Sequence, residues 1–341
     1  MNPNVSIIIL NWNGWQDTLE CLESLFQIKY DNYNVIIVDN NSEDNSISKI
    51  KEYCEGNLKI KSQYVNYDTS NKPIELFEFN EEKLDEIEEI KIPDLPINQK
   101  IILIELGMNY GFAGGNNFGI KFALKFLDPH YILLLNNDTV VDSQFLEILV
   151  KEAQNPNIGI LGPNVYYYDD PERITYIGGN ISCYTGKITH PYFNEIKQMF
   201  NVSEIDYISG CSLLIKKDVI EAFGLMDTNY FLYYEDTDWC LNAKKNGIKI
   251  VHVPEAEIWH KVSASINTSN TALYYGTRNL YLLIRKNCPK NAMITFLPIF
   301  IIKKFLNSII KLFQGKTSES KAILTAFKDI IKGKYGFKEL K

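Results

Sequence analysis

The sequence predicts an α/β fold in which helices flank a central sheet, with a helical extension at the C-terminal end. Short apolar runs of strand length, such as VSIIIL (5–10) and ILLL (132–135), are typical of strands buried on both faces. The early runs end at small polar residues and are followed by helical spacing of apolar side chains. This strand–helix–strand order is that of a parallel sheet.

The first two strands set this pattern. Val5–Leu10 is expected to be the first strand, and Asp17 precedes a helix with apolar residues on one face. Val35–Val38 is expected to be the second strand, ending at Asp39, and another helix follows. The first strand is not followed by G-x-G-x-x-G, which counts against a dinucleotide-binding dehydrogenase.

Residues from about 61 to 100 do not fit the alternation. Between Glu75 and Glu89 there are eight acids and one lysine, with apolar residues interspersed. We expect an inserted excursion here, containing a short amphipathic helix with a solvated acidic face. A partner surface is the alternative.

A glycine-rich stretch follows the next expected strand, Ile101–Leu106. It runs from Asn109 to Asn117 and precedes an expected helix at Phe118–Leu127. Glycines there would let the backbone approach a ligand closely. Many purely structural turns have the same composition.

The stretch Tyr131–Asp142 (YILLLNNDTVVD) carries the clearest chemical signal. Its apolar strand stops at Asn136-Asn137-Asp138. Ligands of open α/β sheets collect at the carboxyl ends of the strands. A carboxylate between carboxamides can bind a divalent cation through oxygen, while the amides hold a polyhydroxylated ligand. A simple turn is the alternative, because Asn and Asp favour turns.

The second half of the chain adds acidic residues and a histidine. Tyr207–Ile215 is expected to be a strand with small residues at its start, and a helix follows at Lys217–Phe223. FLYYEDTDWC (231–240) then places three acids directly after four apolar or aromatic residues, where they are costly to bury unless they bind something. The strand Ile248–Val253 leads to His260.

Together these residues are the parts of a metal-assisted transferase. Asp138 and His260 can supply ligands to Mn²⁺ or Mg²⁺, which would neutralise a diphosphate leaving group. Asp236 can accept a proton from an attacking hydroxyl. Taken singly, Asp236 could instead cap a helix, and a core or surface role is the more common one for a histidine such as His260.

Composition sets the outer bounds. The 341 residues, 45% hydrophobic and 23% charged, suit one large globular domain or two ordinary ones. A net charge of -7 counts against nucleic-acid binding. The cysteines are widely spaced without a C-x-x-C pair, so we expect reduced, buried thiols, no zinc site and a cytoplasmic protein. No secretory signal is recognised at the start.

The C-terminal region differs in charge from the rest. AMITFLPIFII (292–302) is apolar but about half the length of a spanning helix, and Pro298 is expected to interrupt it. Residues 303–341 carry ten lysines and three acids, with apolar residues at helical spacing. Such helices can lie on an anionic membrane. Packing on the catalytic domain, or on a second subunit in a homodimer, is the alternative.

The ordered motifs resemble those of family 2 inverting glycosyltransferases with a GT-A fold, a Rossmann-like mixed sheet flanked by helices. The resemblance covers residues from about 5 to 262 and is carried by VSIIILNWNG, VIIVDNNS, NYGFAGGNN, LLLNNDTVVD, ISGCSLLIKK, FLYYEDTDWC and WHK. The NND motif, GFAGGNN and the later YYGTRNLYLLIRKN most resemble the rhamnosyltransferase-like branch. We therefore expect a catalytic domain at 1–265, including the acidic insertion, and a basic helical extension at 266–341.

The resemblance also implies residue roles. Asp236 matches the catalytic base, with Glu235 beside it contacting the acceptor; Asp138 and His260 match the metal site. Asn136 stands where the family's D-x-D motif has its first Asp, which removes one acidic ligand. Donor contacts are implied for Asn11, Asp39, Asn109, Gly111, Asn117, Asn136, Asn137 and Asp138.

The expected reaction is metal-dependent inverting transfer of a sugar from a nucleoside-diphosphate donor, such as dTDP-rhamnose or a UDP-sugar. The expected acceptor is a glycan or lipid-linked glycan of cell-surface polysaccharide synthesis, at the inner face of the membrane. One alternative is a sugar nucleotidyltransferase, but Asn11–Asp17 lacks the basic residues expected in its N-terminal loop. The other is a catalytically inactive nucleotide- or glycan-binding module, which Asn136 keeps open.

Overall fold

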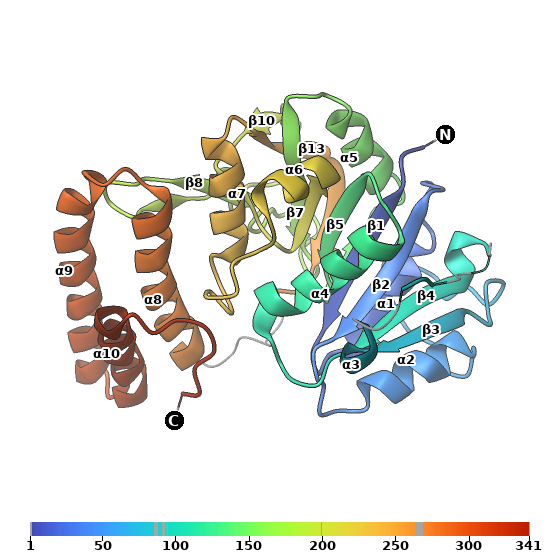
Figure 1. The fold of residues 1–341 in the computed structure, drawn as a ribbon, viewed down its shortest axis with the longest axis horizontal. Helices are drawn as coiled ribbons and strands as arrows, with labels where there is room; N and C mark the ends of the chain where they lie inside the picture. The colour runs from blue at the N-terminus through green and yellow to red at the C-terminus, as the bar shows by residue number, and fades with distance from the viewer. Residues whose placement is uncertain are drawn as a thin grey trace.

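A computed structural model describes residues 2–84, 88–90, 93, 95–198, 200–262 and 269–340. A ten-stranded mixed sheet forms its centre (Figure 1). Nine strands follow one another in the order β10 (Ser203–Glu204), β13 (Lys249–His260), β7 (Ile158–Tyr167), β12 (Ser212–Lys216), β5 (Tyr131–Asn136), β1 (Val5–Asn11), β2 (Tyr33–Asp39), β4 (Lys100–Glu105) and β3 (Glu75–Asn80). The short strand β6 (Thr139–Val141) pairs with β13.

Helices cover both faces of this sheet. Ile7 and Ile9 of β1 lie in one apolar cluster, whereas Ile8 lies in the other, as the two-residue period of a strand requires. The first cluster includes α1 (Trp15–Leu25), α2 (Ser46–Cys54) and α5 (Phe145–Ala153). The second includes α4 (Gly111–Phe126), α6 (Lys217–Phe223) and α7 (Glu235–Lys245). The expected α/β class with a mixed sheet is confirmed.

The register of the central strands aligns their polar ends. β1 pairs in parallel with both β2 and β5, so that Asn11 lies opposite Asp39 and Leu10 lies opposite Asn136. β12 runs antiparallel to β5 and begins beside the end of β5. The carboxyl ends of β1, β2 and β5 therefore meet at one edge, where ligands of open α/β sheets bind.

The glycine-rich stretch is helical, unlike the turn that the sequence predicts. α4 begins at Gly111, seven residues before the expected start. A Cβ on Gly115 would lie 2.5 Å from Leu10, and one on Gly119 would lie 2.7 Å from Ile8. These glycines therefore let the helix lie close against β1.

The acidic insertion is only in part an excursion. β3 pairs in parallel with β4 and forms an edge of the main sheet, and Phe77 and Phe79 pack on the core. The short helix α3 (Glu81–Leu84) follows β3. The acidic residues of β3 lie on an exposed edge of the sheet, and they mask the apolar pattern by which a strand is recognised in the sequence. Residues 85–87, 91, 92 and 94 of this segment lie outside the described residues.

A three-stranded sheet lies beside the main one, in the order β11 (Tyr207–Ile208), β8 (Gly178–Ile181) and β9 (Ile188–Thr189). The strand expected over 207–215 is thus divided into β11 and β12. Gly210 lies between them, and its backbone N–H donates to Asp236.

Three helices form a C-terminal bundle at the left of Figure 1: α8 (Ser269–Asn287), α9 (Ala292–Phe313) and α10 (Thr317–Lys332). The expected interruption at Pro298 is wrong, because α9 continues through it for 22 residues. Phe296 and Phe300 pack with α8 and α10 on either side of Pro298, which holds both halves in one helix. Within the described residues, α9 is the one helix long and apolar enough to cross a membrane.

The cysteines follow the expectation only in part. Cys21, Cys54, Cys211 and Cys240 are free and buried, as expected. Cys183 and Cys288, 105 residues apart, form a disulfide, which contradicts the expectation that all six thiols are reduced. It joins the turn between β8 and β9 to the corner between α8 and α9, two segments that only the tertiary fold brings together.

Candidate active site

The ends of β1 and β2 form a buried polar cluster. The Asn11 amide donates to Asp39 Oδ2 (2.7 Å), and its oxygen accepts a hydrogen bond from the Thr18 hydroxyl (2.7 Å). Ser42 donates to Asp39 through both its backbone N–H and its hydroxyl. Asn137 joins this cluster by donating to Thr18 (3.1 Å). The structure therefore brings Asn11, Asp39 and Asn137 together.

Asp138 and His260 meet from strands far apart in the sequence. Thr139, at the start of β6, pairs with His260, at the end of β13, and this pairing places His260 Nε2 2.9 Å from Asp138 Oδ1. Burial opposes protonation of the imidazole, but Cys211 and the Asp138 carboxylate outweigh it and raise the pKa of His260 well above 6.5. A carboxylate and an imidazole thus converge at the sheet edge.

Cys211 links this pair to the acidic end of α7. Its carbonyl accepts a hydrogen bond from the Asn136 backbone N–H (2.8 Å), and its thiol contacts the His260 ring. The preceding residue, Gly210, donates its N–H to Asp236 Oδ2 (2.8 Å). The turn Gly210–Cys211, between β11 and β12, therefore contacts both Asp236 and the Asp138–His260 pair, although α7 begins nearly a hundred residues after β5.

Glu235 and Asp236 occupy different environments at the start of α7. Asp236 is partly exposed. The burial of its carboxyl group raises its pKa above 3.8, and this effect outweighs the hydrogen bonds from Gly210 and Thr237, which lower the pKa. Glu235 is 4% exposed, and its Oε2 has no hydrogen-bond partner within the part of the chain that the structure describes. Burial and the neighbouring Asp236 raise the pKa of Glu235 well above 4.5. Asp236 is thus the more accessible of the two carboxyl groups.

The expected donor loop divides into two parts. Asn109 accepts hydrogen bonds from Asn40 (3.0 Å) and from the Gly111 N–H (2.8 Å), next to the strand-end cluster. Asn117 is buried. Its amide nitrogen donates to the Met226 carbonyl, and its amide oxygen accepts a hydrogen bond from the Met226 N–H. Asn117 therefore holds the segment that leads to Glu235 and Asp236.

The backbone before Glu235 is held in an unusual conformation. Phe231, Tyr233 and Tyr234 all have positive φ angles, between 62° and 72°. The Asn279 amide donates to the carbonyls of Tyr230, Leu232 and Tyr233, at 2.8–3.0 Å. We call residues 229–234, which lead to the expected base Asp236, the catalytic loop.

Arg278 holds the same loop from the adjacent position. Its guanidinium donates to the carbonyls of Asn229 (3.0 Å), Tyr230 (3.1 Å) and Gly336 (2.7 Å), and it lies over the rings of Tyr274 and Tyr275. Sequence reasoning assigned no role to Arg278 or Asn279. The polar run Thr277–Asn279, set between tyrosine and aliphatic residues in YYGTRNLYLLIRKN, was the available signal.

Lys261 is a third residue for which the sequence predicted no role. Its ammonium lies 2.5 Å from carboxylates of both Asp17 and Glu20 on α1. It thereby ties the end of β13, and with it His260, to α1. In the described part of the chain, no group of three or more His, Cys, Asp or Glu side chains is arranged to hold a metal ion.

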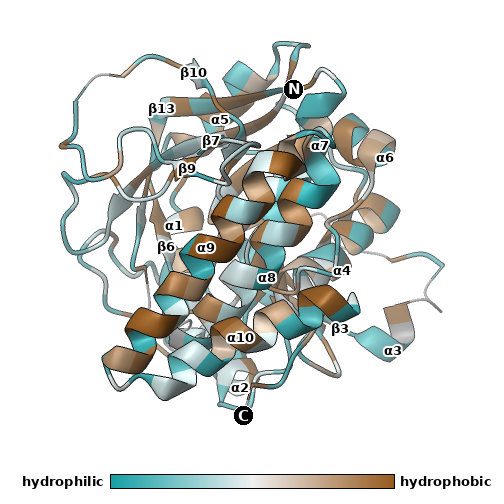
Figure 2. Cartoon of the chain, turned by 90° about the vertical axis from the view of Figure 1, so that its left-hand side faces the viewer, coloured by the Kyte–Doolittle hydropathy of each residue, from teal (hydrophilic) through white to brown (hydrophobic). Residues whose placement is uncertain are grey.

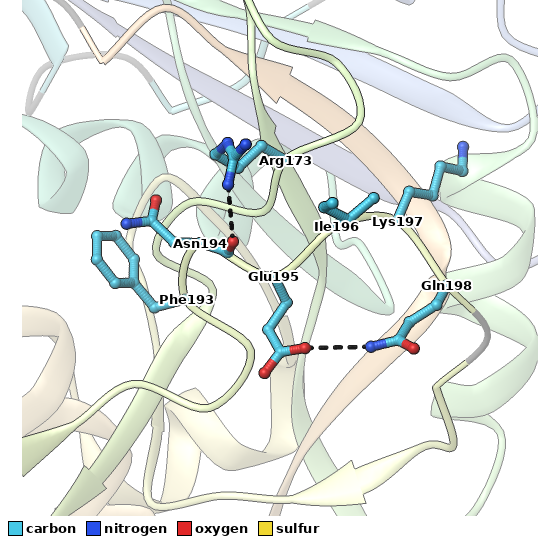
Figure 3. Close-up of a pocket in the computed structure, with 7 residues that line it drawn as sticks. All are labelled: Arg173, Phe193, Asn194, Glu195, Ile196, Lys197 and Gln198. Atoms are coloured by element: carbon cyan, nitrogen blue, oxygen red, sulfur yellow. Dashed lines mark hydrogen bonds between the residues drawn. The ribbon is translucent and has the colours of Figure 1, made fainter.

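A cavity of about 510 Å³ lies elsewhere, around the segment 193–198 (Figure 3). In it Arg173 donates to the Asn194 carbonyl, and Gln198 donates to Glu195. Its lining does not include any residue that the sequence assigned to the site: Arg173, Phe193, Asn194, Glu195, Ile196, Lys197 and Gln198. The convergent carboxylates, rather than this cavity, mark the candidate active site.

Two family models match the chain. Residues 6–70 match "Glycosyl transferase family 2", and residues 92–275, more than half of the chain, match "Glycosyltransferase like family 2". These ranges contain the strand-end cluster, the Asp138–His260 pair and the catalytic loop.

Curated relatives and a solved structure agree with this match. The chain is 27% identical to the dTDP-rhamnosyl transferase RfbF of Shigella flexneri over 84% of this chain and 82% of that protein. It is 25% identical to the low-salt glycan biosynthesis hexosyltransferase Agl10 of Haloferax volcanii, over 52% and 58% of the two chains. The fold is similar to that of the mannosyltransferase PcManGT from Pyrobaculum calidifontis, solved with GDP-Man and Mn²⁺, with a TM-score of 0.55 and 12% identity over 98% of this chain and 88% of that one.

The expected family and fold are therefore confirmed. The strand order, the polar strand ends and the family models agree on one assignment. The chain belongs to glycosyltransferase family 2, has the GT-A fold, and is similar to the rhamnosyltransferases of that family.

Proposed function

We propose that this glycosyltransferase moves a sugar from a nucleoside diphosphate to a hydroxyl with inversion, and that it requires a divalent cation. The observation that supports this most is the meeting of Asp138, His260 and Asp236 around Gly210–Cys211. Such a site has a cation-binding pair and a proton acceptor, the two parts that a direct displacement needs.

The residues present fit a divalent cation. Asp138 and His260 offer one carboxylate oxygen and, once a cation displaces the proton of the ring, one imidazole nitrogen 2.9 Å away, and Mn²⁺ accepts both kinds of ligand. Asn136, at the end of β5, adds a carboxamide in place of an acidic ligand. Diphosphate oxygens would complete the coordination, and the ion would neutralise the charge of the leaving group.

Asp236 is the proposed base. Its Oδ2 accepts the Gly210 N–H and its Oδ1 accepts from Thr237, which fixes the carboxylate while leaving the residue partly exposed. It would take the proton of the acceptor hydroxyl as that oxygen attacks the anomeric carbon, and the bond to the diphosphate breaks on the opposite side. One displacement inverts the configuration, and no covalent enzyme intermediate forms. Glu235, beside Asp236, is proposed to contact the acceptor.

We propose a dTDP-deoxyhexose such as dTDP-rhamnose, or a UDP-sugar, as the donor. The similarity to a dTDP-rhamnosyl transferase supports the first choice. The proposed donor site comprises the Asn11–Asp39 cluster with Asn109, Gly111, Asn117 and Asn136–Asp138. The acceptor is proposed to be a glycan or lipid-linked glycan of cell-surface polysaccharide synthesis, met at the inner face of the membrane.

Nucleotide binding tests the donor part of this proposal. A ligand that binds only the folded state raises the melting temperature. We expect one nucleoside diphosphate among UDP, dTDP, GDP and CDP to raise it, and the increase to grow with Mn²⁺. Asp138→Ala should abolish the Mn²⁺-dependent part. An equal increase with and without Mn²⁺ would contradict the metal site.

Transfer assays test the base. Asp236→Asn should abolish sugar transfer and leave the nucleotide-dependent melting shift, while Asp169→Asn, at an exposed position, should keep both. An Asp236→Asn enzyme with normal turnover would exclude Asp236 as the base. Nucleotide binding by the native chain without transfer to any acceptor would favour an inactive binding module.

A further inference from the structure

Large apolar side chains are exposed along the outward face of α9. Six large side chains on it are exposed to solvent: Ile294, Ile301, Ile302, Phe305, Leu312 and Phe313. At 100° per residue they fall within an arc of about 120° on the helix. We call these six residues the α9 face. Figure 2 shows α9 across the side of the bundle turned to the viewer, with hydrophobic residues along the helix.

The opposite side of α9 is apolar too. Phe296 and Phe300 are buried there against Leu280 and Ile284 of α8 and Phe327 of α10. A helix that is apolar on all sides is normally covered on all sides. The α9 face is therefore a surface that lacks its cover, rather than the polar outer face of an ordinary surface helix.

The charge of the C-terminal region indicates what covers the α9 face. Residues 303–341 carry ten lysines and three acids, whereas the whole chain has a net charge of -7. Lys321, Lys328 and Lys332 are exposed on α10, on the same side of that helix as the exposed Leu324 and Ile331. Apolar and cationic side chains together match an anionic lipid surface. A symmetric dimer through this face would bring the lysines of one copy against those of the other.

Two features indicate that α9 lies along a bilayer rather than across it. Lys303 and Lys304 are at the middle of the helix, where a spanning orientation would place their charges at the centre of the membrane. Lys304 is also half-buried against the bundle, which lowers its pKa. In addition, α9 packs on α10 and α8, and spanning would separate it from them.

We propose that the α9 face docks this protein on an anionic lipid bilayer, with α9 parallel to the membrane plane. The bundle is joined to the catalytic loop through Arg278 and Asn279 of α8, so docking would hold Asp236 at a fixed position relative to the bilayer. This extends the proposed function by naming the surface and the lipid class, and it rests on that function only for the acceptor.

Vesicle sedimentation tests the docking without measuring transfer. We expect the native chain to sediment with vesicles of equal parts phosphatidylcholine and phosphatidylglycerol, and much less with phosphatidylcholine alone. Phe305→Glu and Phe313→Glu together should reduce binding by about tenfold or more, because two exposed apolar contacts are lost. Val202→Glu, an exposed apolar position far from α9 in sequence, should bind as the native chain does. All variants should keep the native melting temperature.

Other results would overturn the proposal. The native chain remaining in the supernatant with both vesicle types would do so, as would equal loss of binding in Val202→Glu. A dimer in solution that Phe305→Glu converts to a monomer, without vesicle binding, would make the α9 face a subunit interface. Retention in the membrane after alkaline carbonate extraction would show a spanning helix instead. Because nucleotide binding and transfer are assayed separately, failure here leaves the proposed function standing.

Discussion

Asn279→Ala tests whether the catalytic loop is held from α8. Asn279 is fully buried, and its amide donates to the carbonyls of Tyr230, Leu232 and Tyr233. The substitution removes all three hydrogen bonds. The Tyr230 carbonyl still accepts a hydrogen bond from Arg278, whereas the carbonyls of Leu232 and Tyr233 lose the one from Asn279. An unmet buried acceptor costs about 1–3 kcal/mol, and because this loop is half-buried we expect a loss of about 2–4 kcal/mol in unfolding free energy.

The same substitution should change catalysis through the backbone of the loop. The three non-glycine residues of the loop with positive φ each carry a backbone strain of about 1 kcal/mol or more. This strain is comparable to the stabilisation that the Asn279 hydrogen bonds provide. Without the Asn279 side chain the loop can relax, and because Asp236 lies two residues beyond the loop, its carboxylate can then shift. Misplacement of a reacting group by about 1 Å lowers rates on the order of 100-fold. We expect a loss of that size in kcat, with the nucleotide-dependent melting shift retained.

Urea unfolding and transfer kinetics would measure both effects. Asn279→Asp is the sharper variant, because it keeps the shape of the side chain and removes the N–H donors. Asn291→Ala, at an exposed position before α9, is the matched control and should behave as the native chain does. If Asn279→Asp kept native kcat and stability, the idea that these hydrogen bonds position the loop would be refuted.

Two further predictions follow from the same region. Gly111→Ala should lower the unfolding free energy by more than about 2 kcal/mol, because Gly111 has a φ of +72° and an added Cβ would lie 2.3 Å from the Phe231 carbonyl oxygen. The control Gly247→Ala has a similar φ of +85° but nothing within 4 Å of the added Cβ, so it should lose only about 1 kcal/mol. Thermal or urea unfolding would measure both losses. The pKa values of Asp236 and Glu235 are raised in the folded state, so their contribution to stability is fully present below the unfolded values of 3.8 and 4.5 and is lost as the pH rises through the folded values. Because the base must be ionised, kcat should increase with pH over the range where Asp236 loses its proton, and a kcat that is flat from pH about 4 upward would contradict the raised pKa.

Local signals in the sequence were enough to predict the central strands β1, β2, β4 and β5 and the polar ends of β1, β2 and β5. Each of these strands is a short apolar run. A polar residue that ends such a run lies at the end of its strand, independently of the rest of the chain. Asn11 and Asp39 each end such a run, and the structure pairs them in register. The edge strand β3 escaped this reasoning, because one exposed side and several acids hide the pattern of a strand.

Contacts between distant segments were decided by the tertiary structure alone. His260 meets Asp138 across 122 residues, and Asn279 reaches Tyr233 across 46. The sequence named His260 by resemblance but gave no reason to connect Asn279 with the catalytic loop. Nothing in a local pattern specifies which carbonyls a buried amide will meet, nor which cysteines will be neighbours, because both depend on how the packed helices and strands bring separate parts of the chain together.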